Sequence, residues 1–176
     1  ALAPNDPQYR EYLGEYQHIQ KLPEQALETW AAIAVDARRN AINVARLAEV
    51  YNSFGYQERA VTEILDACKI DPKDFALQIK ASDYLARVAR YDEAFTFMES
   101  ANKLAVSADE KEEVIKQRIQ LLQSSDRLDE AIATLNEETT GSAATNAAKW
   151  LLLARYLETA RRMPDANDAI ASALKL

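Results

Sequence analysis

The chain has 176 residues and a formal net charge of −7, from 21 basic and 28 acidic side chains. This acidic balance, without any long basic cluster, argues against a nucleic-acid partner. There are 32 alanines but only 3 glycines and 5 prolines, and no alternating β-branched run predicts a sheet, so the composition favours helix throughout.

Other function classes are also disfavoured. No apolar stretch reaches the roughly 20 residues that span a bilayer, so we expect no membrane insertion of this fragment. Residues 1–9, ALAPNDPQY, lack the features of a secretory signal. The compartment stays open, with the cytoplasm favoured. The single cysteine, Cys68, excludes an internal disulfide.

An alanine recurs along the chain at intervals of 34, 34, 37 and 35 residues, at Ala26, Ala60, Ala94, Ala131 and Ala166. A period in this range predicts one supersecondary unit stacked on copies of itself. In chain order we expect the tail of a preceding unit at residues 1–6 and then five units near residues 7–40, 41–74, 75–108, 109–144 and 145–176.

Each unit has the pattern of two amphipathic helices joined by a tight turn. In the second unit, the apolar stripe of the first helix is Val44, Leu47, Ala48 and Tyr51. Gly55 marks the turn. The stripe of the second helix then runs through Ala60, Ile64, Ala67 and Cys68 and ends before Asp71-Pro72.

The two irregular intervals have local explanations. Ser107 and Glu110 have the spacing of a capping box, which predicts that the first helix of the fourth unit begins about one turn early. The extra residue before Ala166 is expected in the loop ETTGSAAT, residues 138–145.

The pattern resembles the tetratricopeptide repeat (TPR), a 34-residue helix–turn–helix unit. The second unit carries its signature most fully, with Leu47, Ala48 and Tyr51, then Gly55, Ala60, Ile64, Ala67 and a closing Pro72. The fourth unit departs from it, because Arg118 and Ile119 occupy the Leu-Gly-like pair, which argues against close helix packing there. The resemblance implies an all-α fold, an α-solenoid with a right-handed superhelix of about ten helices.

The ends of the sequence suggest a window from a longer array. Residues 1–6 match the tail of a repeat, and no polar capping helix follows ASALKL. Self-association through uncapped ends is the alternative that this pattern leaves open.

The inventory of reactive side chains is small. Cys68 falls on a buried stripe, which predicts a packing role, and a lone His18 cannot build a typical zinc site. Acidic runs such as Asp92-Glu93 and Asp129-Glu130 are expected to cap the second helices. We therefore expect no enzyme activity, no metal and no cofactor.

In the TPR family, the first helices line a concave groove that binds peptides or helices of partners. The resemblance places ten candidate binding residues on this face: Glu11, Glu15, His18, Glu49, Asn52, Asp83, Arg87, Lys116, Gln120 and Arg155. The aligned carboxylates Glu15, Glu49 and Asp83 suggest a basic or amide-rich segment as ligand. The alternative interpretation is that they are solvated charges on a helix face.

These observations predict a non-enzymatic protein–protein interaction scaffold that binds a peptide or helix in the groove. An accessory TPR region of a larger enzyme, or of a secretion- or membrane-associated protein, is the alternative. A homo-oligomerising array is a third possibility.

Overall fold

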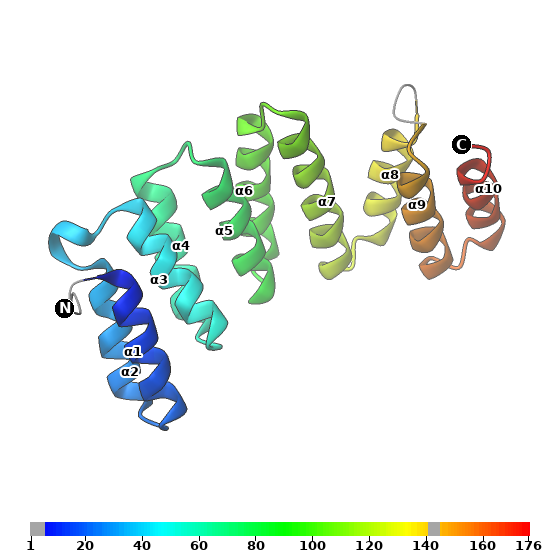
Figure 1. Ribbon diagram of the computed structural model, residues 1–176. Coiled ribbons are helices and arrows are strands. Elements are labelled where there is room, and N and C mark those ends of the chain that lie inside the picture. The colour runs from blue at the N-terminus through cyan, green and yellow to red at the C-terminus, as the bar shows by residue number, and fades with distance from the viewer. Residues whose placement is uncertain (1–5, 141–144) are drawn as a thin grey trace. The chain divides into compact units, whose positions relative to one another are not determined.

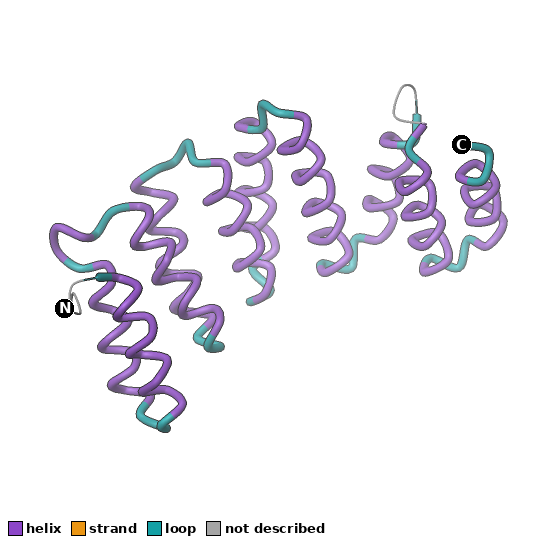
Figure 2. Tube along the Cα trace, in the orientation of Figure 1, coloured by secondary structure: helices purple, strands orange, loops and turns teal. Residues whose placement is uncertain are grey.

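The computed structural model describes residues 6–140 and 145–176, and all regular structure in these ranges is helical (Figure 2). The all-α prediction is therefore confirmed. The chain divides into two compact units, Ala1–Glu110 and Lys111–Leu176. That the repeats form one continuous array stays a prediction, and of the expected tail at residues 1–6 only Asp6 lies within the described ranges.

Unit 1 contains three helix pairs (Figure 1). They are α1 (Pro7–Ile19) with α2 (Pro23–Ala31), α3 (Ala41–Ser53) with α4 (Gln57–Ile70), and α5 (Phe75–Arg87) with α6 (Tyr91–Leu104). Two short 3₁₀ helices, η1 (Ala32–Ala34) and η2 (Asp36–Arg38), connect the first pair to the second.

Unit 2 contains two further pairs. They are α7 (Ala108–Ser124), which starts in the last residues of unit 1, with α8 (Leu128–Glu138), and α9 (Ala147–Thr159) with α10 (Met163–Ala173). The loop between α8 and α9 lies where the sequence predicts it, and its residues 141–144 fall outside the described ranges.

Polar side chains start the first helix of every pair. The side-chain oxygens of Asp6, Asn40, Asp74 and Asn146 each accept a backbone N–H in the first turn that follows. At α7 the predicted capping box forms, because the Ser107 hydroxyl accepts the Glu110 N–H at 3.1 Å and the Glu110 carboxylate accepts the Ser107 N–H at 2.9 Å. As a result α7 has 17 residues, whereas the other four first helices have 13.

The second helices start differently from the expectation. Their N-cap residues are Leu22, Tyr56, Arg90, Arg127 and Arg162, and none makes a side-chain cap hydrogen bond. The predicted capping by the acidic runs is therefore wrong. Instead, an acid in the first turn pairs with the arginine three residues earlier, as in Arg90–Glu93 at 2.7 Å and Arg127–Glu130 at 2.6 Å. These acids still lie where the helix dipole favours a negative charge.

The turn inside each pair has one backbone geometry. A residue with positive φ recurs at intervals of 34, 34, 37 and 35 residues, at Lys21, Gly55, Ala89, Asp126 and Arg161. The N–H of the next residue then donates to the carbonyl five positions earlier, at 2.8–3.0 Å in all five turns. This is the Schellman motif, in which a left-handed residue satisfies carbonyls at a helix end. Four turns adopt it without glycine, at a cost of about 1–2 kcal/mol each.

The recurrent alanines are buried in the second helix of every pair, and all five are at most 1% exposed. The Ser82 hydroxyl on α5 donates to the Ala94 carbonyl on α6 at 2.9 Å, which shows how near the two backbones come. In the fourth pair Ile119 stands at the position of Ser82, and the backbones of α7 and α8 approach less closely than those of the other pairs. This matches the looser packing expected from the sequence.

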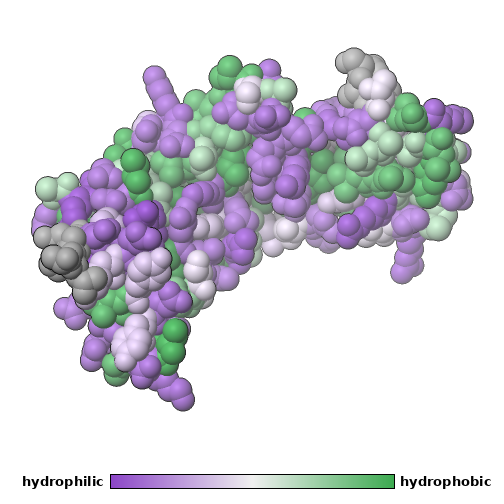
Figure 3. All heavy atoms as spheres, viewed as in Figure 1, coloured by the Kyte–Doolittle hydropathy of each residue, from purple (hydrophilic) through white to green (hydrophobic). Residues whose placement is uncertain are grey.

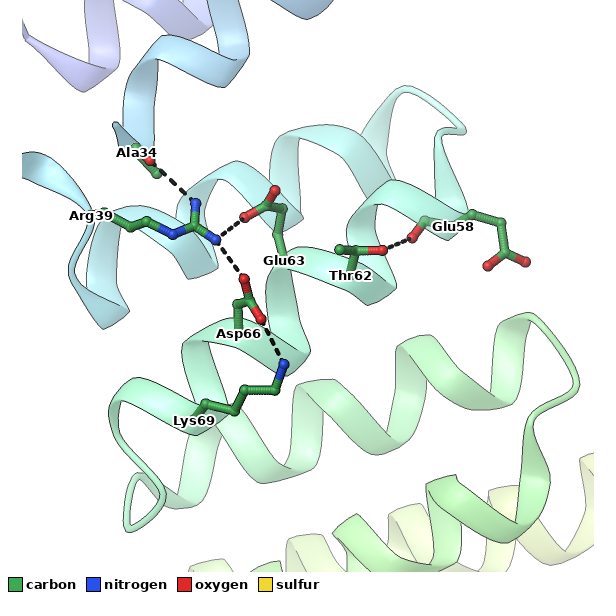
Figure 4. Close-up of polar contacts among 7 residues, drawn as sticks. All are labelled: Ala34, Arg39, Glu58, Thr62, Glu63, Asp66 and Lys69. Carbon is green, nitrogen blue, oxygen red and sulfur yellow. Dashed lines mark hydrogen bonds and ion pairs between the residues drawn. The ribbon is translucent and has the colours of Figure 1, made fainter. Parts of the chain in front are cut away.

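An ion-pair cluster attaches the 3₁₀ segment to α4 (Figure 4). The Arg39 guanidinium donates to the Ala34 carbonyl at 3.4 Å and contacts the carboxylates of Glu63 at 3.4 Å and Asp66 at 2.5 Å. A hydrogen bond from Lys69, together with Arg39, lowers the pKa of Asp66, whereas burial raises the pKa of Glu63. The cluster thus joins the first helix pair to the second.

Candidate binding grooves

Unit 1 has a hollow between α1 and α3, which we call the unit 1 groove. Its volume is about 320 Å³, and it is lined by Glu11, Tyr12, Glu15, Arg46, Glu49, Val50, Ser53 and Phe54. It brings together three of the predicted site residues, Glu11, Glu15 and Glu49.

Most carboxylates on this face are paired with basic side chains. The Arg46 Nε lies 3.1 Å from the Glu11 carboxylate, and Lys80 on α5 forms an ion pair with Glu49. Burial raises the pKa of Glu11 although Arg46 opposes that shift. Glu15 is exposed and makes no ion pair within the described residues, so it is the open carboxylate of the groove.

The structure therefore leaves fewer unpaired carboxylates for the basic or amide-rich ligand that the sequence suggests. Sequence reasoning aligned the carboxylates but missed the parallel basic row of Arg46 and Lys80. The available signal was their separation of 34 residues, which is the repeat period itself. The preference for a basic segment stays a prediction and now depends mainly on Glu15.

Three other predicted residues of unit 1 lie outside the lining of this groove. Asp83 and Arg87 on α5 pair with each other at 2.9 Å, and Asn52 on α3 is half-buried. Their contact with a partner stays a prediction.

His18 lies in an aromatic cluster at the end of α1. Its ring centroid is 5.0 Å from that of Phe54, 5.8 Å from that of Trp30 and 6.0 Å from that of Tyr56. Its Nδ1 is buried and has no hydrogen-bond partner within the described residues. The ring thus packs within unit 1, which reduces the part of it that a ligand could contact.

Exposed aromatic side chains border the unit 1 groove. Tyr12 and Tyr16 on α1 are 62% and 61% exposed, and Ile19 continues the same helix face at 65%. Tyr12 also lines the groove. Exposed tyrosines next to a groove are typical anchors for a protein ligand.

Unit 2 has a larger hollow between α7 and α9, which we call the unit 2 groove. Its volume is about 460 Å³, and the end of α8 contributes Leu135 and Glu138 to it. The predicted residues Lys116, Gln120 and Arg155 all line this groove, together with the apolar side chains of Ile115, Ile119 and Leu152.

Three polar contacts hold the walls of the unit 2 groove. Lys149 on α9 has a side chain only 14% exposed and pairs with Glu112 on α7 at 2.9 Å and with Glu138 on α8 at 2.8 Å. Burial would lower the pKa of Lys149, but the hydrogen bonds that its ammonium donates to the two carboxylates outweigh burial and raise it. The Tyr156 hydroxyl on α9 donates to Gln123 Oε1 on α7 at 2.8 Å. These contacts bridge α7 and α9 across the loosely packed fourth pair.

The lone cysteine lies away from both grooves. Cys68 on α4 is 5% exposed, its thiol donates to the Leu77 carbonyl at 3.4 Å, and burial raises its pKa to about 11. A thiol with this pKa is an unreactive packing group, as the sequence predicts. Within the described ranges, no helix is long and apolar enough to cross a membrane.

No family model and no curated protein matches this sequence, but solved structures share its fold. A structure of MamA is 12% identical over 92% of each chain, with a TM-score of 0.65. A MamA fragment from Desulfovibrio magneticus RS-1 is 14% identical, covers 99% of this chain and 97% of its own, and has a TM-score of 0.66. YrrB, described as a TPR protein with an unusual peptide-binding site, is 16% identical over 97% of this chain and 86% of its own, with a TM-score of 0.60. At these identities the likeness concerns the fold alone: the chain has the helical-repeat fold of TPR-like solenoid proteins.

Proposed function

We propose that this chain is a non-enzymatic protein–protein interaction scaffold that binds a peptide or helix of a partner in its first-helix grooves. The observation that carries this proposal is that each unit has a hollow lined mainly by its first helices, with both apolar and charged side chains in the lining. The peptide-binding site named for YrrB, a protein of similar fold, supports the same use of the fold.

The grooves suit a ligand that contributes a few side chains. Volumes of about 320 and 460 Å³ fall in the range of about 300–1,000 Å³ typical of binding pockets. Their walls are held by pairs such as Arg46–Glu11 and Lys149–Glu138 before any ligand arrives. A preformed groove needs little backbone movement on binding and so loses little conformational entropy.

Binding in the unit 1 groove would depend on an aromatic anchor and an open carboxylate. Tyr12 and Phe54 present apolar surface in the groove, and Glu15 is the carboxylate without an internal partner. This combination favours a segment that carries a lysine, an arginine or an amide beside an apolar side chain.

Affinity capture with matched variants tests this proposal. The bait is the chain itself, as wild type, as Tyr12→Ala, as Glu15→Lys and as the control Glu28→Lys. Glu28 is exposed on the second helix α2, so the control makes the same charge change outside the groove.

We expect partners from a lysate of the source organism to be recovered by wild type and Glu28→Lys and to be lost from both groove variants. Equal recovery by all four baits would exclude the unit 1 groove as the binding site.

A further inference from the structure

The charges that line the unit 2 groove do not cancel. Five charged side chains line it, and Lys149 engages both acidic ones, Glu112 and Glu138. Two further cations line the groove. Lys116 is 62% exposed and forms a long ion pair, of 3.9 Å, with Glu113 on its own helix. Arg155 is exposed and makes no ion pair within the described residues.

The open neutral groups of this groove are also hydrogen-bond donors. Gln123 uses its Oε1 to accept the Tyr156 hydroxyl, which leaves its amide N–H groups to donate. Gln120 is exposed beside it and contributes a second amide. A carboxylate, which only accepts hydrogen bonds when ionised, complements an ammonium, a guanidinium and amide N–H groups.

The same groove has an apolar part. Ile115, Ile119 and Leu152 line it together with Lys116 and Arg155. A ligand that has only charged groups would not cover this apolar surface. A peptide can place a large apolar side chain against it and a carboxylate beside that side chain.

From these contacts we infer that the unit 2 groove binds a segment of a partner protein in which an aspartate or glutamate neighbours a large apolar residue. The inference rests on the proposed scaffold function and names the ligand class of this groove. Lys116 and Arg155 bind the carboxylate, and Leu152 with its isoleucine neighbours covers the apolar side chain. The unit 1 groove has the opposite balance, because its cations are paired and Glu15 is open.

Three fluorescein-labelled synthetic peptides of equal length test the inference by fluorescence polarisation. The first carries two glutamates flanking a leucine, the second replaces both glutamates by glutamine, and the third replaces them by lysine. We expect the acidic peptide to bind wild-type protein at least about tenfold more tightly than the glutamine peptide, as charge-assisted hydrogen bonds are about twice as strong as neutral ones. That advantage should shrink as the salt concentration rises.

Variants assign the effect to the groove. Lys116→Gln combined with Arg155→Gln should remove the advantage of the acidic peptide, while circular dichroism shows that helix content is unchanged. The control combines Lys111→Gln with Lys175→Gln, two exposed lysines of unit 2 outside the groove lining, and should keep the advantage.

The outcomes separate this inference from the proposed function. The inference is overturned if the acidic peptide binds no more tightly than the glutamine peptide up to about 1 mM, or if the groove double variant keeps the preference. If the glutamine or lysine peptide binds instead and Leu152→Asp abolishes that binding, the scaffold function stands without the acidic preference. If no peptide binds and affinity capture is indifferent to every groove variant, the scaffold function fails as well.

Discussion

Replacement of Gly14 by alanine should destabilise the protein, although the same change usually stabilises a helix. Gly14 is buried in the middle of α1, where alanine is ordinarily better by about 1 kcal/mol. A Cβ added at Gly14 would lie 2.2 Å from Trp30 Nε1 and 2.4 Å from its Cδ1. The indole is fully buried and rigid, so one side chain or backbone must shift by more than 1 Å.

The magnitude follows from these two opposing effects. Overpacking in a well-packed core costs about 1–3 kcal/mol, and a contact this short against a fixed ring lies at the upper end. The gain in helix propensity of about 1 kcal/mol offsets part of this cost, so Gly14→Ala should lower the free energy of unfolding by about 2 kcal/mol. The Trp30 indole also donates to the Glu11 carbonyl at 3.2 Å, and displacement of the ring would weaken that bond.

The repeat itself supplies the control. In the second pair the equivalent positions hold Ala48 and Ile64, both fully buried, so a small–large pair of different sizes fits the same crossing. In a Trp30→Ile background, Gly14→Ala should therefore stabilise by about 1 kcal/mol instead of destabilising.

Urea unfolding of wild type, both single variants and the double variant, followed by circular dichroism, gives the four free energies of this cycle. If Gly14→Ala stabilises wild type, or has the same effect in both backgrounds, the assignment of a glycine–indole contact at this crossing is refuted.

Three further predictions concern single positions. Both Ala89 and Gly55 have positive φ. Ala89→Gly should therefore raise the free energy of unfolding by about 0.5–1 kcal/mol, and Gly55→Ala should lower it by about 1 kcal/mol. An unchanged thermal unfolding midpoint for both variants would contradict the turn geometry. Hydrogen bonds from the backbone of Ser107 and Val106 lower the pKa of Glu110 below its ordinary 4.5, so the ionised carboxylate stabilises the fold above about pH 4.5 and loses this effect as the pH falls through the folded-state pKa. The difference in unfolding midpoint between wild type and Glu110→Ala should thus be larger at about pH 7 than at about pH 3. An equal difference at both would rule out the capping-box charge. Cys68 should react with an aromatic disulfide reagent at about pH 8 only after unfolding, and rapid reaction in the folded protein would show that its burial is wrong.

The helical fold was predictable from the sequence because its signal repeats. The interval of the alanines predicted a buried position in the second helix of each pair, and Ser107 with Glu110 predicted the early start of α7. The 3₁₀ segment after α2 was not predictable, because AAIAVDAR has good helix propensity and its path is held by Arg39 contacts to residues 24 and 27 positions away. The left-handed turn residues were not predictable either, since Gly55 is the one glycine among the five.

The candidate site was predictable only in part. Counting from the repeat placed Lys116, Gln120 and Arg155 on one face, and one groove brings them together. That they contact a partner stays a prediction. Which charges stay open could not be predicted, because it depends on partners from other helices. Lys149 neutralises two carboxylates from positions 37 and 11 residues before it. Ion pairs of this kind depend on how closely the helices approach. That distance differs in the loosely packed fourth pair, so it does not follow from the repeat.

Figure 3 shows that hydrophobic residues also lie on the surface over the region of α9 and α10. Met163 at the start of the second helix α10 is 52% exposed, and Leu174 after α10 is 82% exposed. A partner could therefore contact the chain elsewhere than at the first-helix face, so the location of contact must be measured directly.

Site-specific photo-cross-linking to a captured partner makes that measurement. A benzophenone side chain is introduced singly at Glu15 and at Gln120, which line the two grooves, and at Glu28 and Ala133, which are exposed on the second helices α2 and α8. The scaffold account predicts adducts with the partner from at least one groove position and none from the second-helix positions. Adducts from Glu28 or Ala133 with none from either groove position would contradict it.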